Sequence, residues 1–178
     1  MTIRKIARMG HPVLLERASE VGDVSAVHDL ISDMHETLVD SGGIGLAAPQ
    51  VHESLRVILI SVPDQRRQEG EAAMQITPLI NPVLEPVGDE KVHGWEGCLS
   101  IPGLRGSVPR WKTVSFKALN MAGQSIEGEA TGMMARVLQH EVDHLDGILY
   151  PMRMDDLAQM GFDEEIGRYA LSLSLIHI

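Results

Sequence analysis

The sequence contains one cysteine, Cys98, and few aromatic residues, with two each of Trp, Tyr and Phe among its 178 residues. A single cysteine excludes an internal disulfide and is typical of a reducing compartment. The scarcity of aromatic rings argues against stacking on single-stranded nucleic acid, and the net charge of −10 argues against a basic groove for DNA. The sequence also lacks an apolar run of the ~20 residues that a membrane helix needs, and it lacks a recognisable secretory signal. We therefore expect a cytoplasmic protein that binds neither DNA nor membranes.

The composition itself is that of a globular domain. Hydrophobic residues make up 44% of the chain and charged residues 22%, which excludes disorder as its main state. A chain of this length can bury a substantial core as one domain, and we expect that domain to span residues 1–170. Residues 171–178 fit poorly with the acidic stretch before them. We interpret them as a non-native ending, with a native final turn or strand as the alternative.

The spacing of apolar residues predicts both helices and strands. Helical spacing recurs over residues 24–38, 131–145 and 154–173. Strand patterns occur over residues 56–62, 113–119 and 125–130, and the last two are joined by a turn at 120–123. These elements do not alternate as βαβ units. We therefore expect an α+β domain, in which antiparallel or mixed sheets pack around the helix over residues 131–145.

Two further stretches are less regular. Residues 79–87 contain Pro82 and Pro86, and proline in a strand pattern predicts at best an edge or broken strand. Residues 64–75 are mostly polar and indicate a surface loop.

The most informative segment of the chain is His140-Glu-Val-Asp-His144. Two histidines four residues apart lie on one face of a helix, where their imidazoles can hold one cation. The adjacent Glu141 can then reach a water molecule whose pKa the cation lowers. The alternative is a surface helix with two unconnected histidines. The apolar residues around them favour inward-facing side chains, and we therefore expect a central metal-binding helix.

A third ligand is required, and the residues leave two candidates. Cys98 lies 42 residues before His140, and Glu164 lies 20 residues after His144. Glu164 is part of an acidic run, which is more typical of a solvated helix face. Tyr150 stands where one protease pattern requires a third histidine. With Glu164 as ligand the chain would be a zinc endopeptidase, and a peptide-binding module with a structural metal is a further alternative.

A glycine-rich run precedes a glutamine at residues 42–50. Its glycines fit a dinucleotide-binding fingerprint superficially, but a helix precedes them and Pro49 interrupts the helix that should follow. As an extended strand, the run could instead lie against a peptide backbone. Gln50 could then donate to a developing oxyanion. The alternative is a tight turn with Gln50 in solvent.

Three segments together resemble the signature motifs of the peptide deformylase family. They occur in the family's order, at similar intervals, and the resemblance covers roughly residues 3–165. The segments are Gly43-Ile-Gly-Leu-Ala-Ala-Pro-Gln50, Glu96-Gly-Cys-Leu-Ser100 and Gln139-His-Glu-Val-Asp-His144. The resemblance implies removal of the N-formyl group from nascent polypeptides that begin with formyl-methionine, with release of formate.

The resemblance also implies roles for individual residues. The metal ligands would be Cys98, His140 and His144, with water or hydroxide as the fourth ligand. Glu141 would be the general base and then the acid, and the side chain of Gln50 and the backbone N–H of Leu99 would be the oxyanion donors. The implied cofactor is one divalent ion, Fe²⁺ in cells, with Zn²⁺ or Ni²⁺ able to occupy the site.

The substrate-binding residues are implied in the same way. The backbones of Ile44, Gly45 and Gly97 would pair with the substrate as an added strand. The methionine side chain would enter a pocket formed by Ile44, Met133, Val137 and His140, and Arg105 and Arg136 would line its mouth. The implied partners are an N-formylmethionyl peptide and, transiently, the ribosome, and we expect a monomer.

Overall fold

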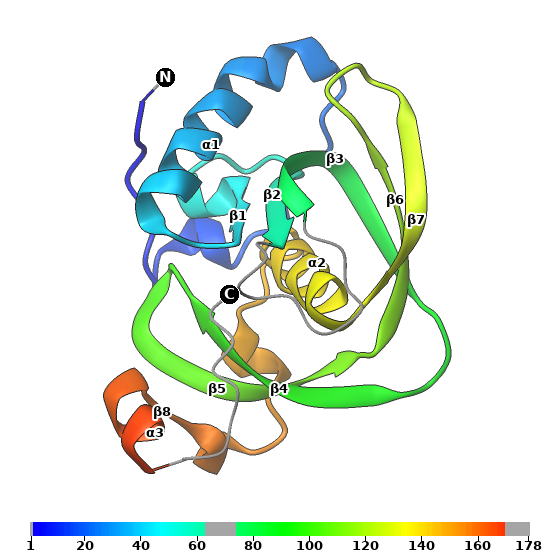
Figure 1. Cartoon of the computed structure of the whole chain (residues 1–178). Coiled ribbons are helices and arrows are strands. Elements are labelled where there is room, and N and C mark those ends of the chain that lie inside the picture. Colours follow the sequence, from blue (N-terminus) through cyan, green and yellow to red (C-terminus); the bar gives the residue numbers. More distant parts are fainter. Residues whose placement is uncertain (1, 63–73, 170–178) are drawn as a thin grey trace.

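The computed structural model describes residues 2–62 and 74–169 (Figure 1). Its helices are α1 (His28–Ser41), α2 (Gly132–Leu145) and α3 (Asp163–Tyr169). Its strands are β1 (Gly45–Ala47), β2 (Val57–Val62), β3 (Met74–Pro86), β4 (Lys91–Cys98), β5 (Ile101–Trp111), β6 (Thr113–Leu119), β7 (Ser125–Thr131) and β8 (Met160–Phe162). Short 3₁₀ turns are η1 (Pro12–Leu14), η2 (Val24–Val27), η3 (Ala48–Val51), η5 (Tyr150–Arg153) and η6 (Leu157–Gln159). The α+β expectation is confirmed.

The strands form two antiparallel sheets. One has the order β1-β2-β3-β6-β7 and the other the order β4-β5-β8. Helix α2 lies between them and packs against β1, β2 and β7 of the first sheet and against β5 of the second (Figure 1). Helix α1 lies on the opposite face of β1 and β2. Within the described ranges, no helix combines the length and the hydropathy needed to cross a membrane.

Strand β2 is apolar except for Ser61, and both of its faces are buried. Ile58 and Ile60 point into the core shared with α2, whereas Val57 and Leu59 point into the core shared with α1. Alternation of side chains along a strand makes this division possible. The position of β2 in its sheet therefore fixes one core on each side of it.

Strand β3 agrees with the expectation of an edge or broken strand for residues 79–87. Its residues up to Ile80 pair with β2, whereas Val83–Pro86 pair with β6 alone among the described residues. Pro82 falls where the register with β6 shifts between Ile80 and Val83, and Asn81 there has φ = 51°. A proline cannot donate to a ladder, and this irregularity accommodates it.

Two predicted helices differ from the structure. Residues 24–27 form a 3₁₀ turn capped by Asp23, and α1 runs from His28 to Ser41, with Gly42 at φ = 66° as its C-cap. The predicted helix over 154–173 is wrong for residues 154–162, which form η6 and the strand β8 paired with β5. The side chain of Asp156 accepts a hydrogen bond from the Ala158 N–H at 2.9 Å, which favours a short turn there.

Some expectations fall on residues that the structure does not describe. Most of the predicted loop at 64–75 and the ending at 171–178 lie outside the described residues.

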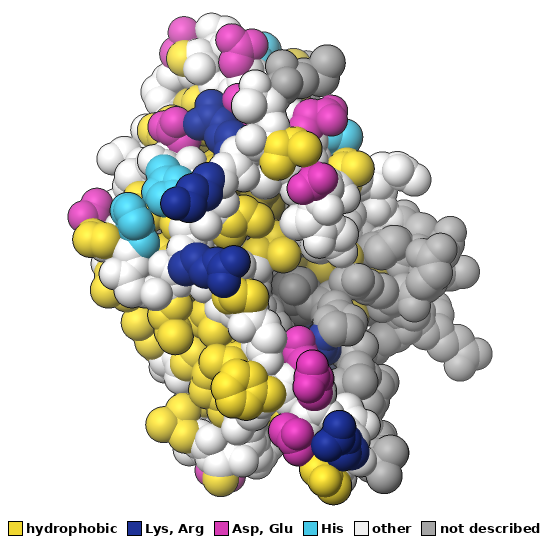
Figure 2. Space-filling view, turned by 90° about the vertical axis from the view of Figure 1, so that its left-hand side faces the viewer, with side chains coloured by type: hydrophobic (Ala, Val, Ile, Leu, Met, Phe, Trp, Pro, Cys, Tyr) yellow, Lys and Arg dark blue, Asp and Glu magenta, His cyan; other side chains and the backbone are white. Residues whose placement is uncertain are grey.

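On the side of the molecule where α1 and β1 lie, the surface is hollowed near its middle, and hydrophobic side chains line the hollow (Figure 2).

Candidate metal centre

Helix α2 carries two histidines into the interior. His140 is 3% exposed and His144 is 1% exposed. Their ring centroids lie 5.1 Å apart, as expected for residues one helical turn apart. The apolar residues of α2 hold this face against the larger sheet. The interpretation as a surface helix therefore does not hold.

Cys98 reaches the same point from the end of β4. The β4–β5 register shifts between Gly97 and Cys98, and the Cys98 Sγ lies 3.2 Å from Nε2 of His144. The ligand atoms of Cys98, His140 and His144 all lie within 4.8 Å of one another. Glu164 is exposed on α3 and is not part of this group. Of the two candidates for a third ligand, Cys98 is therefore the one that lies with the two histidines.

Glu96 orients one of these ligands. It precedes Cys98 by two residues on β4, so both side chains point to the same face of the strand. The Glu96 carboxylate lies 2.9 Å from Nδ1 of His140, and it accepts hydrogen bonds from Arg110 and Arg136. With Nδ1 engaged, Nε2 of His140 faces the metal position.

The charges around Glu96 keep it ionised. Burial would raise the pKa of Glu96, but the Arg110 guanidinium and the hydrogen bonds from Arg110 and His140 hold it well below its usual value. Burial opposes a charge on His140, yet its contacts with Cys98 and Glu96 raise its pKa well above 6.5. Burial lowers the pKa of His144 well below 6.5. Metal binding displaces protons from such groups.

The donor set fits a divalent transition ion. One thiol and two imidazoles are ligands that Fe²⁺, Zn²⁺ and Ni²⁺ accept, and three protein ligands leave a position for water or substrate. The Nδ1 atom of His144 is buried without a hydrogen-bond partner in the described structure. The donors therefore fit a catalytic metal better than a closed structural one.

Glu141 stands beside the ligands, and one oxygen of its carboxylate is unpaired. Its Oε2 is buried and has no hydrogen-bond partner in the described structure. Burial raises its pKa to about 7, which suits a group that accepts and returns a proton near neutral pH. The carboxylate lies against Gly45, since a Cβ built there would be 2.1 Å from Oε1 of Glu141. A residue without a side chain is therefore required at position 45.

Gln50 is also part of the site. Its side chain is buried, which excludes a glutamine in solvent. Its Oε1 accepts the Ala47 N–H at 2.8 Å, and its Nε2 donates to Ser100 Oγ at 3.2 Å and lies 3.5 Å from Cys98 Sγ. The amide N–H₂ group is therefore aimed at the ligand cluster, and Leu99 is adjacent to Cys98.

The predicted substrate residues fall into two groups. Ile44, Met133 and Val137 are buried in one apolar cluster. Gly45 lies on β1 and Gly97 on β4, and both strands are at the edges of their sheets in the described part of the chain.

The two arginines expected at the pocket mouth are buried in ion pairs. Arg136 donates to Glu96 and to the carbonyls of Gly94, Val92 and Val108. Arg105 pairs with Asp163 of α3, and its side chain is 2% exposed. Both guanidinium groups pair with carboxylates because a buried charge without a partner is costly.

The sequence analysis missed Glu96, Arg110 and Asp143 as a connected group. Arg110 binds Glu96 through two nitrogens at 2.8 and 2.9 Å and binds Asp143 at 2.5 Å. Strand alternation from Cys98 could have indicated Glu96. No local pattern connects Arg110 with either carboxylate, because the three residues come from three different elements.

A buried cysteine and two histidines beside a carboxylate with one unpaired oxygen define a metal-dependent hydrolase. The sequence model of polypeptide deformylases matches residues 3–160. Peptide deformylase 1 of Bordetella pertussis is 46% identical over 164 residues, which cover 91% of this chain and 93% of that protein. Peptide deformylase 1 of Prochlorococcus marinus is 46% identical over 170 residues, covering 93% and 88%. The chain belongs to the peptide deformylase family.

Solved structures of relatives have the same fold. The peptide deformylase of Thermotoga maritima matches with a TM-score of 0.79 and 34% identity, over 88% of this chain and all of that one. A class I type b peptide deformylase from Acinetobacter baumannii, crystallised with Met-Ala-Ser bound, matches with a TM-score of 0.78 and 34% identity, over 86% and 100%.

Proposed function

We propose that this enzyme hydrolyses the formamide bond of N-formylmethionyl peptides and releases formate from the ends of nascent polypeptides. The main support for this function is that Cys98, His140 and His144 lie together. Beside them lies the Glu141 carboxylate, whose Oε2 has no hydrogen-bond partner among the described residues. The Met-Ala-Ser peptide bound to the A. baumannii relative has the chemistry of the deformylated product. The substrate is thus a peptide with a formylated N-terminal methionine.

Cys98, His140 and His144 would hold the metal. A divalent ion bound there acts as a Lewis acid, which lowers the pKa of a water molecule and polarises the formyl oxygen. We propose Fe²⁺ as the ion in cells, as the family resemblance implies, with Zn²⁺ and Ni²⁺ as substitutes, since the softness and geometry of the donor set allow all three.

Glu141 moves the proton. Its carboxylate accepts a proton from the attacking water and passes it to the amine nitrogen as the C–N bond breaks. One new C–O bond forms, so the products are formate and a peptide with a free N-terminus. The raised pKa of Glu141, about 7, supports both directions of this transfer.

Gln50 and Leu99 stabilise the developing charge. The Nε2 of Gln50 and the backbone N–H of Leu99 donate to the oxyanion that forms when water adds to the formyl carbon. The position of the Gln50 amide, 3.5 Å from Cys98 Sγ, supports this role.

The peptide binds between two sheet edges. Gly45 and its neighbour Ile44 on one side and Gly97 on the other would pair with the substrate backbone as an added strand. The methionine side chain would pack against Ile44, Met133, Val137 and His140. The apolar wall of the hollow in Figure 2 is consistent with such a ligand.

The proposed function also suggests the oligomeric state, the location and the partners of the enzyme. We propose a monomeric catalytic domain over residues 1–170, located in the cytoplasm, where nascent chains emerge from ribosomes and a transient ribosome contact would supply substrate.

Formate release from formyl-Met-Ala-Ser by anaerobically purified protein tests this function. We expect turnover in the wild type, its loss in Glu141→Ala with metal retained, and no cleavage of the acetylated peptide. Turnover of internal peptide bonds, or no formate release by metal-loaded protein, would overturn the proposal.

A further inference from the structure

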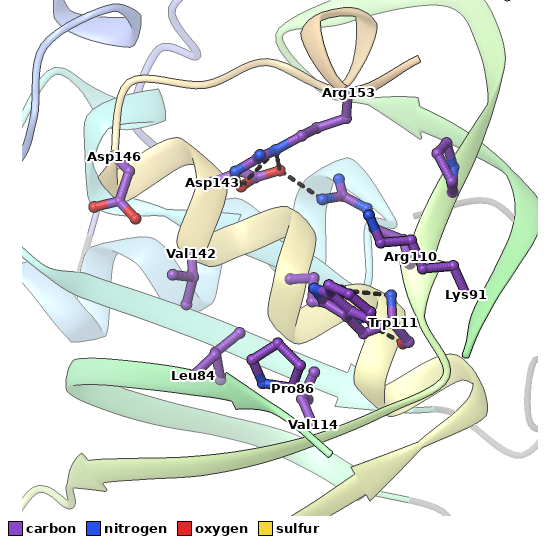
Figure 3. Close-up of a pocket in the computed structure, with 12 residues that line it drawn as sticks. Leu84, Pro86, Lys91, Arg110, Trp111, Val114, Val142, Asp143, Asp146 and Arg153 are labelled. Carbon is purple, nitrogen blue, oxygen red and sulfur yellow. Dashed lines mark hydrogen bonds and ion pairs between the residues drawn. The ribbon is translucent and has the colours of Figure 1, made fainter. Parts of the chain in front are cut away.

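Asp143 lies on the same helix as the two histidines. It follows His140 by three residues, and its side chain is 9% exposed. Its carboxylate accepts from Nη1 of Arg110 at 2.5 Å on one side. On the other side it accepts from Nη2 of Arg153 at 2.7 Å and from Nε at 3.1 Å (Figure 3). Asp143 therefore joins two guanidinium groups that come from different parts of the chain.

These contacts continue to a proposed metal ligand. Arg110 binds both oxygens of Glu96, and Glu96 contacts Nδ1 of His140 at 2.9 Å. The connected side chains are Arg153, Asp143, Arg110, Glu96 and His140. Arg153 is 47% exposed, whereas the others are at most 9% exposed. The chain of contacts thus begins near the surface and ends at the metal site.

Arg153 borders a cavity of about 210 Å³ that reaches Asp143. The apolar walls of this cavity include Leu84, Trp111 and Val142 (Figure 3). A carboxylate bordering such a cavity needs a charged partner or water. With Arg153 in place, Asp143 has two cationic partners and shares Arg110 with Glu96. Without Arg153, Asp143 keeps Arg110 as its remaining partner and competes with Glu96 for it.

We propose that Arg153 is a positioning residue for the metal centre. By holding Asp143, it keeps Arg110 on Glu96 and thereby keeps Nε2 of His140 aimed at Cys98. This inference rests on the proposed metal site. Removal of a direct partner of a metal ligand lowers metal affinity about 10–100-fold. We expect a smaller loss of metal affinity on removal of Arg153, because Arg153 acts through three intervening side chains.

The chain contains a matched control. Arg17 pairs with Asp146, one turn beyond Asp143 on α2, at 3.8 Å, and its side chain is 80% exposed. Asp146 also pairs with Arg56, and among the described residues no hydrogen bond or ion pair joins Asp146 or Arg56 to Glu96 or His140. Arg17→Gln therefore removes the same charge from the same end of the helix without touching the contacts that lead to the metal.

The experiment measures Co²⁺ binding to metal-free protein against a competing chelator, together with the visible spectrum of the Co²⁺ form. We expect Arg153→Gln to weaken binding by about three- to tenfold and to shift the absorption bands of the Co²⁺–thiolate site. Arg17→Gln should stay within about twofold of wild type, as an exposed pair contributes little. Arg153→Lys should recover part of the affinity because it restores the charge.

A double-mutant comparison tests whether Arg153 acts on the metal site through Asp143. If Arg153 acts through Asp143, then Arg153→Gln has no further effect on Co²⁺ affinity in an Asp143→Asn background. Equal affinities of Arg153→Gln and Arg17→Gln would overturn the proposal, as would additive effects in the double variant. If Cys98→Ser binds Co²⁺ as tightly as wild type, the metal site of the proposed function fails instead, and the role of Arg153 fails with it.

Discussion

Replacing Gly45 by alanine would place a methyl group where the carboxylate of Glu141 now lies. The added Cβ would be 2.1 Å from Oε1 and 2.7 Å from Cδ of Glu141. Ordinary van der Waals contact begins at 3.4 Å, so the carboxylate must move by about 1.3 Å. A displacement of about 1 Å at a catalytic group can cost about 10²-fold in rate. We therefore expect kcat/KM for formyl-Met-Ala-Ser to fall about 10²-fold.

The variant should still fold and bind metal. Overpacking a buried position costs about 1–3 kcal/mol, which is less than the 5–15 kcal/mol stability typical of a domain. Glu141 is not among the three grouped ligand residues, so the metal content should equal that of wild type. Formate release can be followed by coupling to formate dehydrogenase, with metal measured by mass spectrometry and folding by thermal denaturation.

Gly22→Ala is the matched control, because a Cβ at Gly22 meets nothing within 4 Å. In a Glu141→Ala background, where the clashing carboxylate is gone, Gly45→Ala should cause little further loss. If Gly45→Ala alone retains activity within about threefold of wild type while folded and metal-loaded, the carboxylate of Glu141 does not carry the proton from the position that the structure gives it.

Four other substitutions test separate predictions about the site. Gln50→Ala should lower kcat by about 10²–10³ at unchanged metal content, because it removes one oxyanion donor; a wild-type kcat would remove Gln50 from the mechanism. Cys98→Ala should lose both metal and formate release, whereas Glu164→Ala should lose neither, and metal analysis of both would expose an endopeptidase-like ligand set if the results were reversed. Glu96→Ala should lower the free energy of unfolding in urea by about 3–5 kcal/mol, because it leaves the buried Arg110 without one of its carboxylates; a loss below about 1 kcal/mol would show that Glu96 does not anchor this ion-pair group.

The local patterns of the sequence were sufficient for several elements. The hairpin of β6 and β7, the buried strand β2 and the helix α2 follow from spacing over a few neighbouring residues. Strands β4 and β5 were not recognised as a long hairpin, because their glycines and prolines obscure the alternation. β8 was mistaken for helix because its strand partner, β5, lies about 50 residues away in sequence.

The order of residues along the chain sets which chemical groups are available and which pairs are close on one helix. His140 and His144 had to share a face of α2, since that spacing is a property of the helix alone. Their resemblance to a family motif then implied the reaction.

How distant segments meet followed from the tertiary structure alone. It placed Cys98, and not Glu164, beside the two histidines, and it paired Arg136 with Glu96. It also set Glu141 against Gly45. These outcomes depend on how two sheets enclose α2, and a distance between side chains from separate strands and helices is set by that packing, which no short stretch of sequence encodes.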